Sequence, residues 1–142
     1  MPVRRAHRWL YPIDWPELSR MVRFGRAKGR CEQCARPHGA LVCHLGDGRW
    51  FDDADGIWRD GRGRALKRQE GPPSEGHRTT RVYLATAHLD HDPGHNRLSN
   101  LKALCQRCHM LNDRPEHLRR RRLKHLMGRA LGDLFDGVYR EP

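Results

Sequence analysis

The chain has 142 residues, the size of one ordinary domain, and its 28 Lys and Arg against 17 Asp and Glu give it a formal net charge of +11. Only 37% of its residues are hydrophobic, so we expect a lean core. No apolar run reaches the length of a membrane-spanning helix or a signal-peptide core, which predicts a soluble, intracellular protein without a membrane partner. The positive charge predicts a polyanionic partner, nucleic acid first, because lysine and arginine gain affinity for phosphates by releasing condensed counterions.

Residues 1–30 are predicted to form an N-terminal arm and a helix. The arm has no clear periodicity, and its basic and aromatic members are Arg4, Arg5, Arg8, Trp9 and Tyr11. Asp14 precedes Glu17 by three residues, the pattern of a capping box that opens a helix. We expect this helix to run to about Lys28 and to end at Gly29.

Four of the five cysteines form two C-x-x-C pairs, Cys31 with Cys34 and Cys105 with Cys108. This spacing is typical of zinc knuckles, whereas disulfides rarely produce it in a chain without a secretory signal. We therefore predict one structural Zn²⁺ ion bound by these four thiolates, with residues 31–45 as the first knuckle. The fifth, Cys43, is expected to be an ordinary buried thiol, although His44 beside it leaves a further ligand pair open.

Residues 46–78 form an insertion of different composition, rich in Gly, Asp and Trp. Its two Asp-Gly-x-Trp stretches predict a short hairpin packed by the indoles of Trp50 and Trp58, because Asp-Gly is a strong turn signal. Its aspartates also suggest a calcium loop, but they lack the spacing and the closing glutamate of an EF-hand. From residue 62 to residue 81 the polar composition predicts a loop.

A strand, a loop and a second strand are predicted after the insertion. Residues 79–89 are β-branched and aromatic at their start, and Asp90 and His91 follow at the end of this strand. Residues 92–97 have the composition of a loop, and residues 98–104 alternate as a short strand does. A helix is expected to begin between Cys105 and Cys108, so that residues 79–113 form a ββα unit with His109 in the first turns of its helix.

A further helix is predicted within residues 114–142, after Pro115. Asp113 and Glu116 have the spacing of a capping box for it. The helix is strongly basic, and its candidate nucleic-acid-binding residues are Arg119, Arg120, Arg121, Arg122 and Lys124. Four consecutive arginines point all round a helix, so part of this run is expected to be a solvated face. The remainder is expected to contact phosphates without reading sequence.

The residues around the second cysteine pair resemble the HNH endonuclease family, in its zinc-supported ββα-metal branch of phage and bacterial type. The match covers residues 31–113 discontinuously, and its core is Ala-His-Leu-Asp-His (87–91), Asn-Leu (100–101) and Leu-Cys-Gln-Arg-Cys-His (104–109). The letters H, N and H fall on His91, Asn100 and His109. The chain departs from the family pattern in the long gap between its cysteine pairs, which contains the insertion.

The resemblance implies a small single α+β domain with a ββα-metal core and flanking helices that cleaves DNA. His91 would act as general base, and Asp90 with His109 would hold a catalytic Mg²⁺ or Mn²⁺, for which Ni²⁺ can substitute. Asn100 would bond the backbone of the loop at residues 92–99 and orient His91. The partner would be double-stranded DNA, cut by a monomer or homodimer in the cytoplasm of a bacterial or phage-infected cell.

The sequence leaves the roles of two residues and two alternative functions open. His88 lies on the same strand face as Asp90 and either contacts the scissile phosphate or packs. Asp113 follows His109 by four residues and is either a further metal ligand or the cap of the next helix, the second being favoured. Two other functions remain as alternatives: a catalytically inactive zinc-stapled nucleic-acid-binding module, and a nuclease that acts on RNA.

Overall fold

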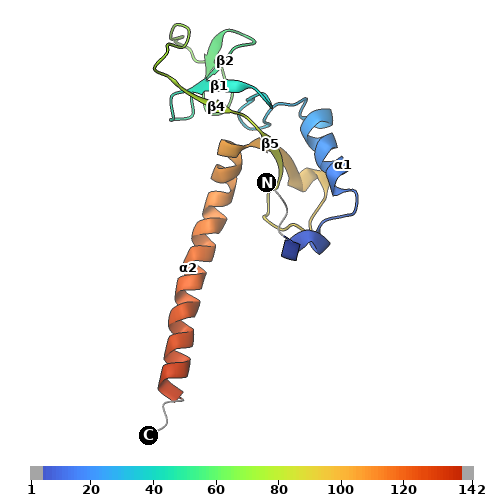
Figure 1. The fold of residues 1–142 in the computed structure, drawn as a ribbon, viewed down its shortest axis with the longest axis vertical. Coiled ribbons are helices and arrows are strands. Elements are labelled where there is room, and N and C mark those ends of the chain that lie inside the picture. Colours follow the sequence, from blue (N-terminus) through green and yellow to red (C-terminus); the bar gives the residue numbers. More distant parts are fainter. Residues whose placement is uncertain (1–4, 139–142) are drawn as a thin grey trace. The chain divides into compact units, whose positions relative to one another are not determined.

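The computed structural model describes the backbone of residues 5–138 and the side chains up to Ala130, apart from that of Ala6 (Figure 1). The ends of the predicted arm and tail, residues 1–4 and 139–142, lie outside the described residues. The fold is the small mixed α+β arrangement expected from the sequence. It divides into two compact units, residues 1–110 and 111–142, and the division falls inside the last helix, α2 (Gln106–Val138). Among the described helices none combines the length and apolar character needed to cross a membrane.

The N-terminal region forms a short 3-10 helix, η1 (Arg5–Leu10), and then a longer helical segment. That segment consists of α1 (Trp15–Arg20) and a π-helical continuation, η2 (Met21–Arg26). Asp14 is the N-cap residue as predicted, but its side chain makes no capping hydrogen bond. The helical segment ends two residues earlier than expected, and Gly29 follows in the left-handed region with φ +72°.

The larger sheet has the strand order β3-β2-β1-β4, and all of its neighbouring strands are antiparallel. Its strands are β1 (Leu41–His44), β2 (Trp50–Asp52), β3 (Ile57–Arg59) and β4 (Arg78–Arg81). The predicted tryptophan hairpin is confirmed: β2 pairs with β3, and Trp50 and Trp58 are 0% and 1% exposed. The insertion is therefore integrated into a sheet whose other strands flank it in sequence.

The smaller sheet is an antiparallel pair, β5 (Leu84–His88) with β6 (Leu101–Cys105). The prediction of one strand over residues 79–89 is wrong, because that stretch supplies β4 to the first sheet and β5 to the second. The chain leaves the first sheet at Val82, whose N–H still bonds the Ala40 carbonyl, and the next N–H, of Tyr83, bonds the Gln106 side chain instead. The predicted strand over 98–104 begins later, since its first residues form a 3-10 turn, η3 (Leu98–Asn100).

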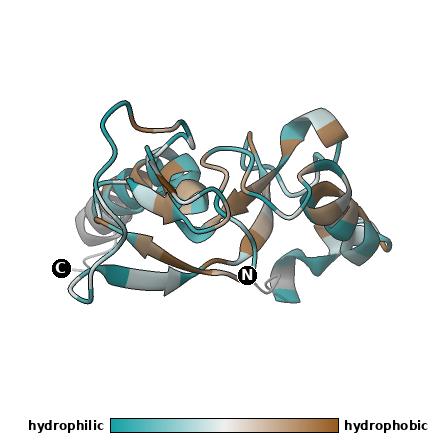
Figure 2. Ribbon diagram, turned by 90° about the horizontal axis from the view of Figure 1, so that it is seen from above, coloured by the Kyte–Doolittle hydropathy of each residue, from teal (hydrophilic) through white to brown (hydrophobic). Residues whose placement is uncertain are grey.

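Two small clusters of buried side chains form the core of the first unit, and Figure 2 shows hydrophobic colour on several of the strands that contribute to them. The larger cluster contains four of the five cysteines and comprises Cys31, Cys34, Val42, Trp50, Val82, Leu84, Ala87, Leu104, Cys105 and Cys108. The smaller one joins Val22 of the helical segment to Leu101 and Ala103 of β6. The core is as small as the composition predicts, and four of the ten residues in its larger cluster are cysteines.

The last helix, α2, begins at Gln106, within the predicted interval, and continues without a break through Pro115. The prediction of a second helix capped at Asp113 is wrong, because Asp113 lies in the interior of α2 and receives a hydrogen bond from the side chain of its neighbour Asn112. Proline removes one helical N–H and crowds the preceding turn. Pro115 is exposed, so water can reach the Leu111 carbonyl that lacks this partner.

Replacing Pro115 with alanine should strengthen α2 locally, because proline is about 3 kcal/mol less favourable than alanine inside a helix. Hydrogen exchange of the amides at residues 111–120 should slow, and far-UV circular dichroism should show no loss of helix. Gly128→Ala is a matched control at another open helix position, with an expected gain of only about 1 kcal/mol. If the helix were instead interrupted at Pro115, Pro115→Ala would change its stability little. Asp113→Ala would then reduce stability, because it would remove the N-cap of a second helix.

Candidate functional site

The four predicted zinc ligands converge in the first unit. Cys31 and Cys34 flank a tight turn after η2, Cys105 ends β6 and Cys108 lies in the first turn of α2. Their four sulfurs lie within 4.8 Å of one another, and all four residues are buried. A tetrahedral Zn²⁺ with Zn–S bonds of about 2.3 Å requires sulfurs roughly 3.8 Å apart. The cluster therefore fits a structural metal site in which four thiolates bind one ion and leave no position open.

Hydrogen bonds to sulfur prepare this cluster for a cation. The Cys105 N–H donates to Cys31 Sγ at 3.3 Å. Arg36 donates from Nη1 to Cys34 Sγ at 3.4 Å. Four thiolates around Zn²⁺ carry two net negative charges, so this guanidinium offsets part of the charge in the core.

Arg36 also joins the insertion to the cysteine cluster. Although it is a cation, it is only 6% exposed, and its guanidinium lies 5.6 Å from the ring centroid of Trp50. Its Nη2 donates to the Gly48 carbonyl at 3.1 Å. Arg107, which lies between Cys105 and Cys108, packs closely against Gly48. A Cβ atom at Gly48 would lie only 2.6 Å from Arg107 Nη2. Arginines of both knuckles thus contact the turn between β1 and β2.

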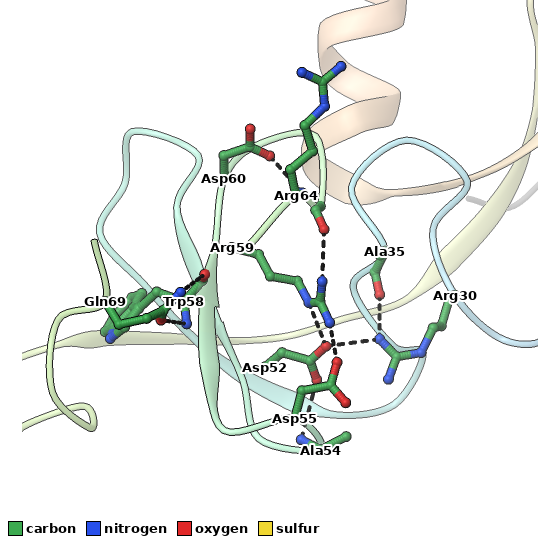
Figure 3. Close-up of polar contacts among 11 residues, drawn as sticks. Arg30, Ala35, Asp52, Ala54, Asp55, Trp58, Arg59, Asp60, Arg64 and Gln69 are labelled. Carbon is green, nitrogen blue, oxygen red and sulfur yellow. Dashed lines mark hydrogen bonds and ion pairs between the residues drawn. The ribbon is translucent and has the colours of Figure 1, made fainter. Parts of the chain in front are cut away.

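A buried carboxylate forms a second connection between the insertion and the first knuckle (Figure 3). Asp52 is 1% exposed and accepts from Arg30 Nη1 at 3.2 Å and from Arg59 Nε at 2.8 Å. Burial alone would raise its pKa, but the hydrogen bonds from Arg59 and Arg30 outweigh burial and hold the pKa below the usual range. Arg30 also donates to the Ala35 carbonyl in the knuckle turn, so Asp52 fixes the segment that carries Cys31 and Cys34.

The candidate catalytic residues Asp90 and Asn100 are joined at the opposite end of the β5–β6 pair from Cys105. Asn100 is 7% exposed, and its Nδ2 donates to Asp90 Oδ1 at 2.8 Å and to the His95 carbonyl at 2.9 Å. Its Oδ1 accepts from the Asp90 N–H at 3.2 Å. One buried amide therefore holds both the carboxylate and the following loop, including the backbone contact in that loop expected of Asn100.

His95 also belongs to this cluster, although its position in the sequence does not indicate it. Its Nδ1 lies 2.5 Å from Asp90 Oδ2, so both oxygens of the carboxylate have partners. The pKa of Asp90 lies well below its usual range, chiefly because the Asp92 N–H donates to it, and further because of His95 and Asn100. These partners favour the ionised carboxylate, which is the form that binds a hard cation. No spacing signal marked His95, because the contact depends on how the loop folds back.

His91 follows Asp90 with φ +62°, in the left-handed region that residues other than glycine seldom adopt. Its N–H donates to the His88 carbonyl at 3.3 Å, which closes a tight turn at the end of β5. Backbone in this region is energetically unfavourable and is found disproportionately at functional sites. The turn sets the direction in which the His91 side chain leaves the strand.

The other candidates lie on different elements. His88 is stacked on Trp15, with ring centroids 5.3 Å apart, and its Nε2 lies 2.9 Å from Asn96 Oδ1, so this side chain packs. His109 is half-buried in the first turns of α2 and belongs to the same compact unit as Asp90. Asp113 belongs to the second unit. Within the described residues, the cysteine cluster is the one group of three or more potential metal ligands whose donor atoms converge.

The basic run lies on α2 in the second unit. Glu116 accepts hydrogen bonds from Arg119 and Arg120, and these bonds lower the pKa of Glu116 to about 2. Arg121, Arg122 and Lys124 are exposed. Two of the five predicted phosphate-binding side chains thus pair with a carboxylate on their own helix, and this pairing reduces the positive charge they present.

Comparison with known proteins gave no match for this chain among family models, curated proteins or solved structures. Its chemistry is therefore inferred from its own residues and geometry.

Replacing Arg36 with methionine should weaken zinc binding, by roughly 10- to 100-fold if the loss matches that of other groups that support metal ligands. The buried thiolates would lose both a donor and a compensating charge. Competition with a chromophoric chelator would measure the affinity, and the charge-transfer absorption of the Co²⁺-loaded protein would report the four-sulfur geometry.

Arg49→Met is the matched control for this prediction, because Arg49 is more exposed and pairs with Asp47 and Glu70 and not with a cysteine. It should leave the zinc affinity unchanged. If Arg36→Met does not fold, Arg36→Gln removes the charge while keeping a polar side chain and permits the same comparison. Wild-type affinity in Arg36→Met would disprove the compensating role.

Proposed function

We propose that the protein is a metal-dependent endonuclease of the HNH type that hydrolyses phosphodiester bonds in DNA. One observation carries the proposal: the buried Asn100 amide bonds both the Asp90 carboxylate and the backbone of the following loop. An ionised carboxylate, a histidine on a constrained turn and an orienting amide are the parts that such a hydrolase requires. The strained backbone of His91 supports the same assignment.

His91 acts as the general base in this proposal. A neutral imidazole has an unperturbed pKa of about 6.5 and is suited to take a proton from water near neutral pH. The resulting hydroxide attacks the phosphorus, and the bond to the 3′ oxygen breaks, so the product carries a 5′-phosphate. Asn100 fixes the loop and the carboxylate, so that the proton acceptor and the ligand keep their relative positions.

Asp90 and His109 are the residues that would hold the catalytic cation. A carboxylate oxygen and an imidazole nitrogen suit Mg²⁺ or Mn²⁺, with Ni²⁺ as a substitute. When bound, the cation would stabilise negative charge on the phosphate and on the leaving oxygen. Asp90 is ionised, and its contact with His95 would have to rearrange for Oδ2 to become a ligand.

DNA is the proposed partner because the net charge is +11 and α2 presents exposed basic side chains. A second candidate function is a zinc-stapled nucleic-acid-binding module without catalysis. It is favoured by the cysteine cluster and the basic helix, which serve binding without a second cation. A nuclease that acts on RNA is a further alternative, and it would cleave an RNA substrate in preference to DNA.

The function is tested by incubating the zinc-loaded protein with supercoiled plasmid, with and without Mg²⁺ or Mn²⁺. We expect metal-dependent conversion to open-circle or linear DNA, and His91→Ala should lower the rate by about 100-fold or more because it removes the base. Zinc content and DNA affinity should be retained in this variant. A structured RNA substrate in parallel separates DNA from RNA cleavage.

His125→Ala is a matched control for this experiment, since His125 is exposed on α2 and the proposal gives it no role. It should cleave at the wild-type rate. A protein that binds DNA and carries zinc but converts no plasmid with either cation would favour the binding module. Equal loss of activity in both histidine variants would contradict the role of His91.

Substituting both Arg121 and Arg122 with alanine should weaken DNA binding and flatten its salt dependence. Each lost phosphate contact should lower the slope of log affinity against log salt concentration by roughly 0.9. Fluorescence anisotropy at several salt concentrations would measure the slope. Arg49→Ala removes one charge from the insertion and serves as the control, and an unchanged slope in the double variant would assign Arg121 and Arg122 to the solvated face of α2.

A further inference from the structure

The helix η1 and the turn that follows it expose two large apolar side chains that the proposed mechanism does not use. Trp9 is 79% exposed and Ile13 is fully exposed. They lie four residues apart in a stretch, residues 5–13, that contains Arg5, His7 and Arg8 and no acidic residue. Exposed apolar side chains of this size often mark a binding surface. The positive charges beside them favour an anionic partner.

This segment is fixed against the candidate catalytic loop. The ring of Tyr11 lies edge-on to Trp15 at 4.8 Å and to His88 at 5.7 Å between centroids. The His88 Nε2–H donates to Asn96 Oδ1 at 2.9 Å, and Asn96 Nδ2 donates to the Leu10 carbonyl at 3.5 Å. The backbone that carries Trp9 is therefore anchored to the strand end and loop from which Asp90, His91 and His95 project.

An exposed tryptophan beside arginines suits one ligand chemistry well. The indole face stacks on a nucleobase while guanidinium groups contact the phosphates on either side. In an intact duplex the base faces are already stacked on one another and are inaccessible. Stacking on Trp9 therefore requires a base that is unpaired, or one that the protein itself unstacks, as inserted apolar side chains do in other DNA complexes.

We propose that residues 5–13 form a base-stacking element and that the substrate class of the candidate site is DNA with unpaired bases next to the scissile phosphate. This inference rests on the proposed nuclease function and narrows its substrate. Trp9 stacks on an unpaired base, Arg5 and Arg8 bind the adjoining phosphates, and Ile13 packs against the junction with the duplex. The contacts of Tyr11 and Asn96 place this element at a constant distance from Asp90 and His91.

The first test is a binding measurement on the full-length, zinc-loaded protein without added Mg²⁺ or Mn²⁺. Fluorescence anisotropy would compare a blunt duplex with the same duplex carrying a short single-stranded tail. Wild-type protein should prefer the tailed DNA, and Trp9→Ala should reduce that preference roughly five- to 150-fold, the range for losing one stacked base. Trp9→Phe should keep part of it, because a smaller aromatic ring still stacks.

Tyr83→Ala is the matched control, because Tyr83 is an exposed aromatic residue, 54% accessible, at the junction of β4 and β5. It should leave the preference unchanged. Because Trp9 and Ile13 bury little surface, their alanine variants should fold, which zinc content and circular dichroism would verify. Equal affinity of the wild-type protein for blunt and tailed DNA would overturn the proposal, as would an unchanged preference in Trp9→Ala.

The second test separates this inference from the proposed function. Cleavage of blunt and tailed DNA with Mg²⁺ or Mn²⁺ is followed in the wild type and in Trp9→Ala. Faster cleavage of tailed DNA that depends on Trp9 supports both proposals. Cleavage without any dependence on Trp9 overturns the stacking element and leaves the nuclease intact. Binding that depends on Trp9, with no cleavage in any metal, supports the stacking element as a binding site and overturns the nuclease.

Discussion

Four of the ten residues in the larger buried cluster are cysteines, where a domain of this size would ordinarily place aliphatic side chains. They bring together segments that are far apart in the chain: the turn after the N-terminal helices, the end of β6 and the start of α2. Structural zinc binding contributes on the order of 10 kcal/mol to folding in small domains, which is comparable to the whole stability of many proteins. Only 37% of the residues are hydrophobic, and the first unit has few other buried side chains, so zinc bound at this cluster would make a large contribution to its stability.

The β5–β6 pair connects the cysteine cluster to the candidate catalytic residues. In its register Leu84 opposes Cys105 at one end, and His88 opposes Leu101 at the other, just before Asp90 and just after Asn100. Cys105 at one end of this pair belongs to the cysteine cluster, and the buried Asn100 amide closes the other end. The Asp90 carboxylate is therefore held by elements that are themselves held at the sulfurs.

The arginines of this protein serve two purposes, so its net charge overstates the surface available for phosphate. Arg36 and Arg59 are engaged inside the first unit, with Cys34 sulfur and with the Asp52 carboxylate. Arg26 bonds Glu32 and the carbonyls of Leu98 and Leu101, which ties the N-terminal helical segment to the start of β6. Exposed arginines occur on several elements, and among them those on η1 and α2 are given a role in binding by the proposals above.

The sequence by itself determined the features that depend on local chemistry. The C-x-x-C spacing predicted the tetrathiolate cluster because each pair can present two sulfurs to one ion, and the Asp-Gly turns predicted the tryptophan hairpin. The start of α2 also followed from local signals, as did a helix end shortly before Gly29. The assignment to the HNH family and the catalytic roles remain predictions, since they rest on residue order and on contacts that do not by themselves report activity.

Only the tertiary structure decided the features that depend on long-range pairing. Residues 79–89 have one strand-like pattern, yet β1 recruits its first part and β6 its second, because backbone groups pair with whichever strand the fold brings beside them. Pro115 and Asp113 have the local signature of a helix boundary, but α2 continues through them. The contacts of His95 with Asp90 and of Arg36 with Cys34 form where the chain folds back on itself, in a loop and in the turn of the first knuckle. Sequence periodicity does not predict the conformation of such loops and turns.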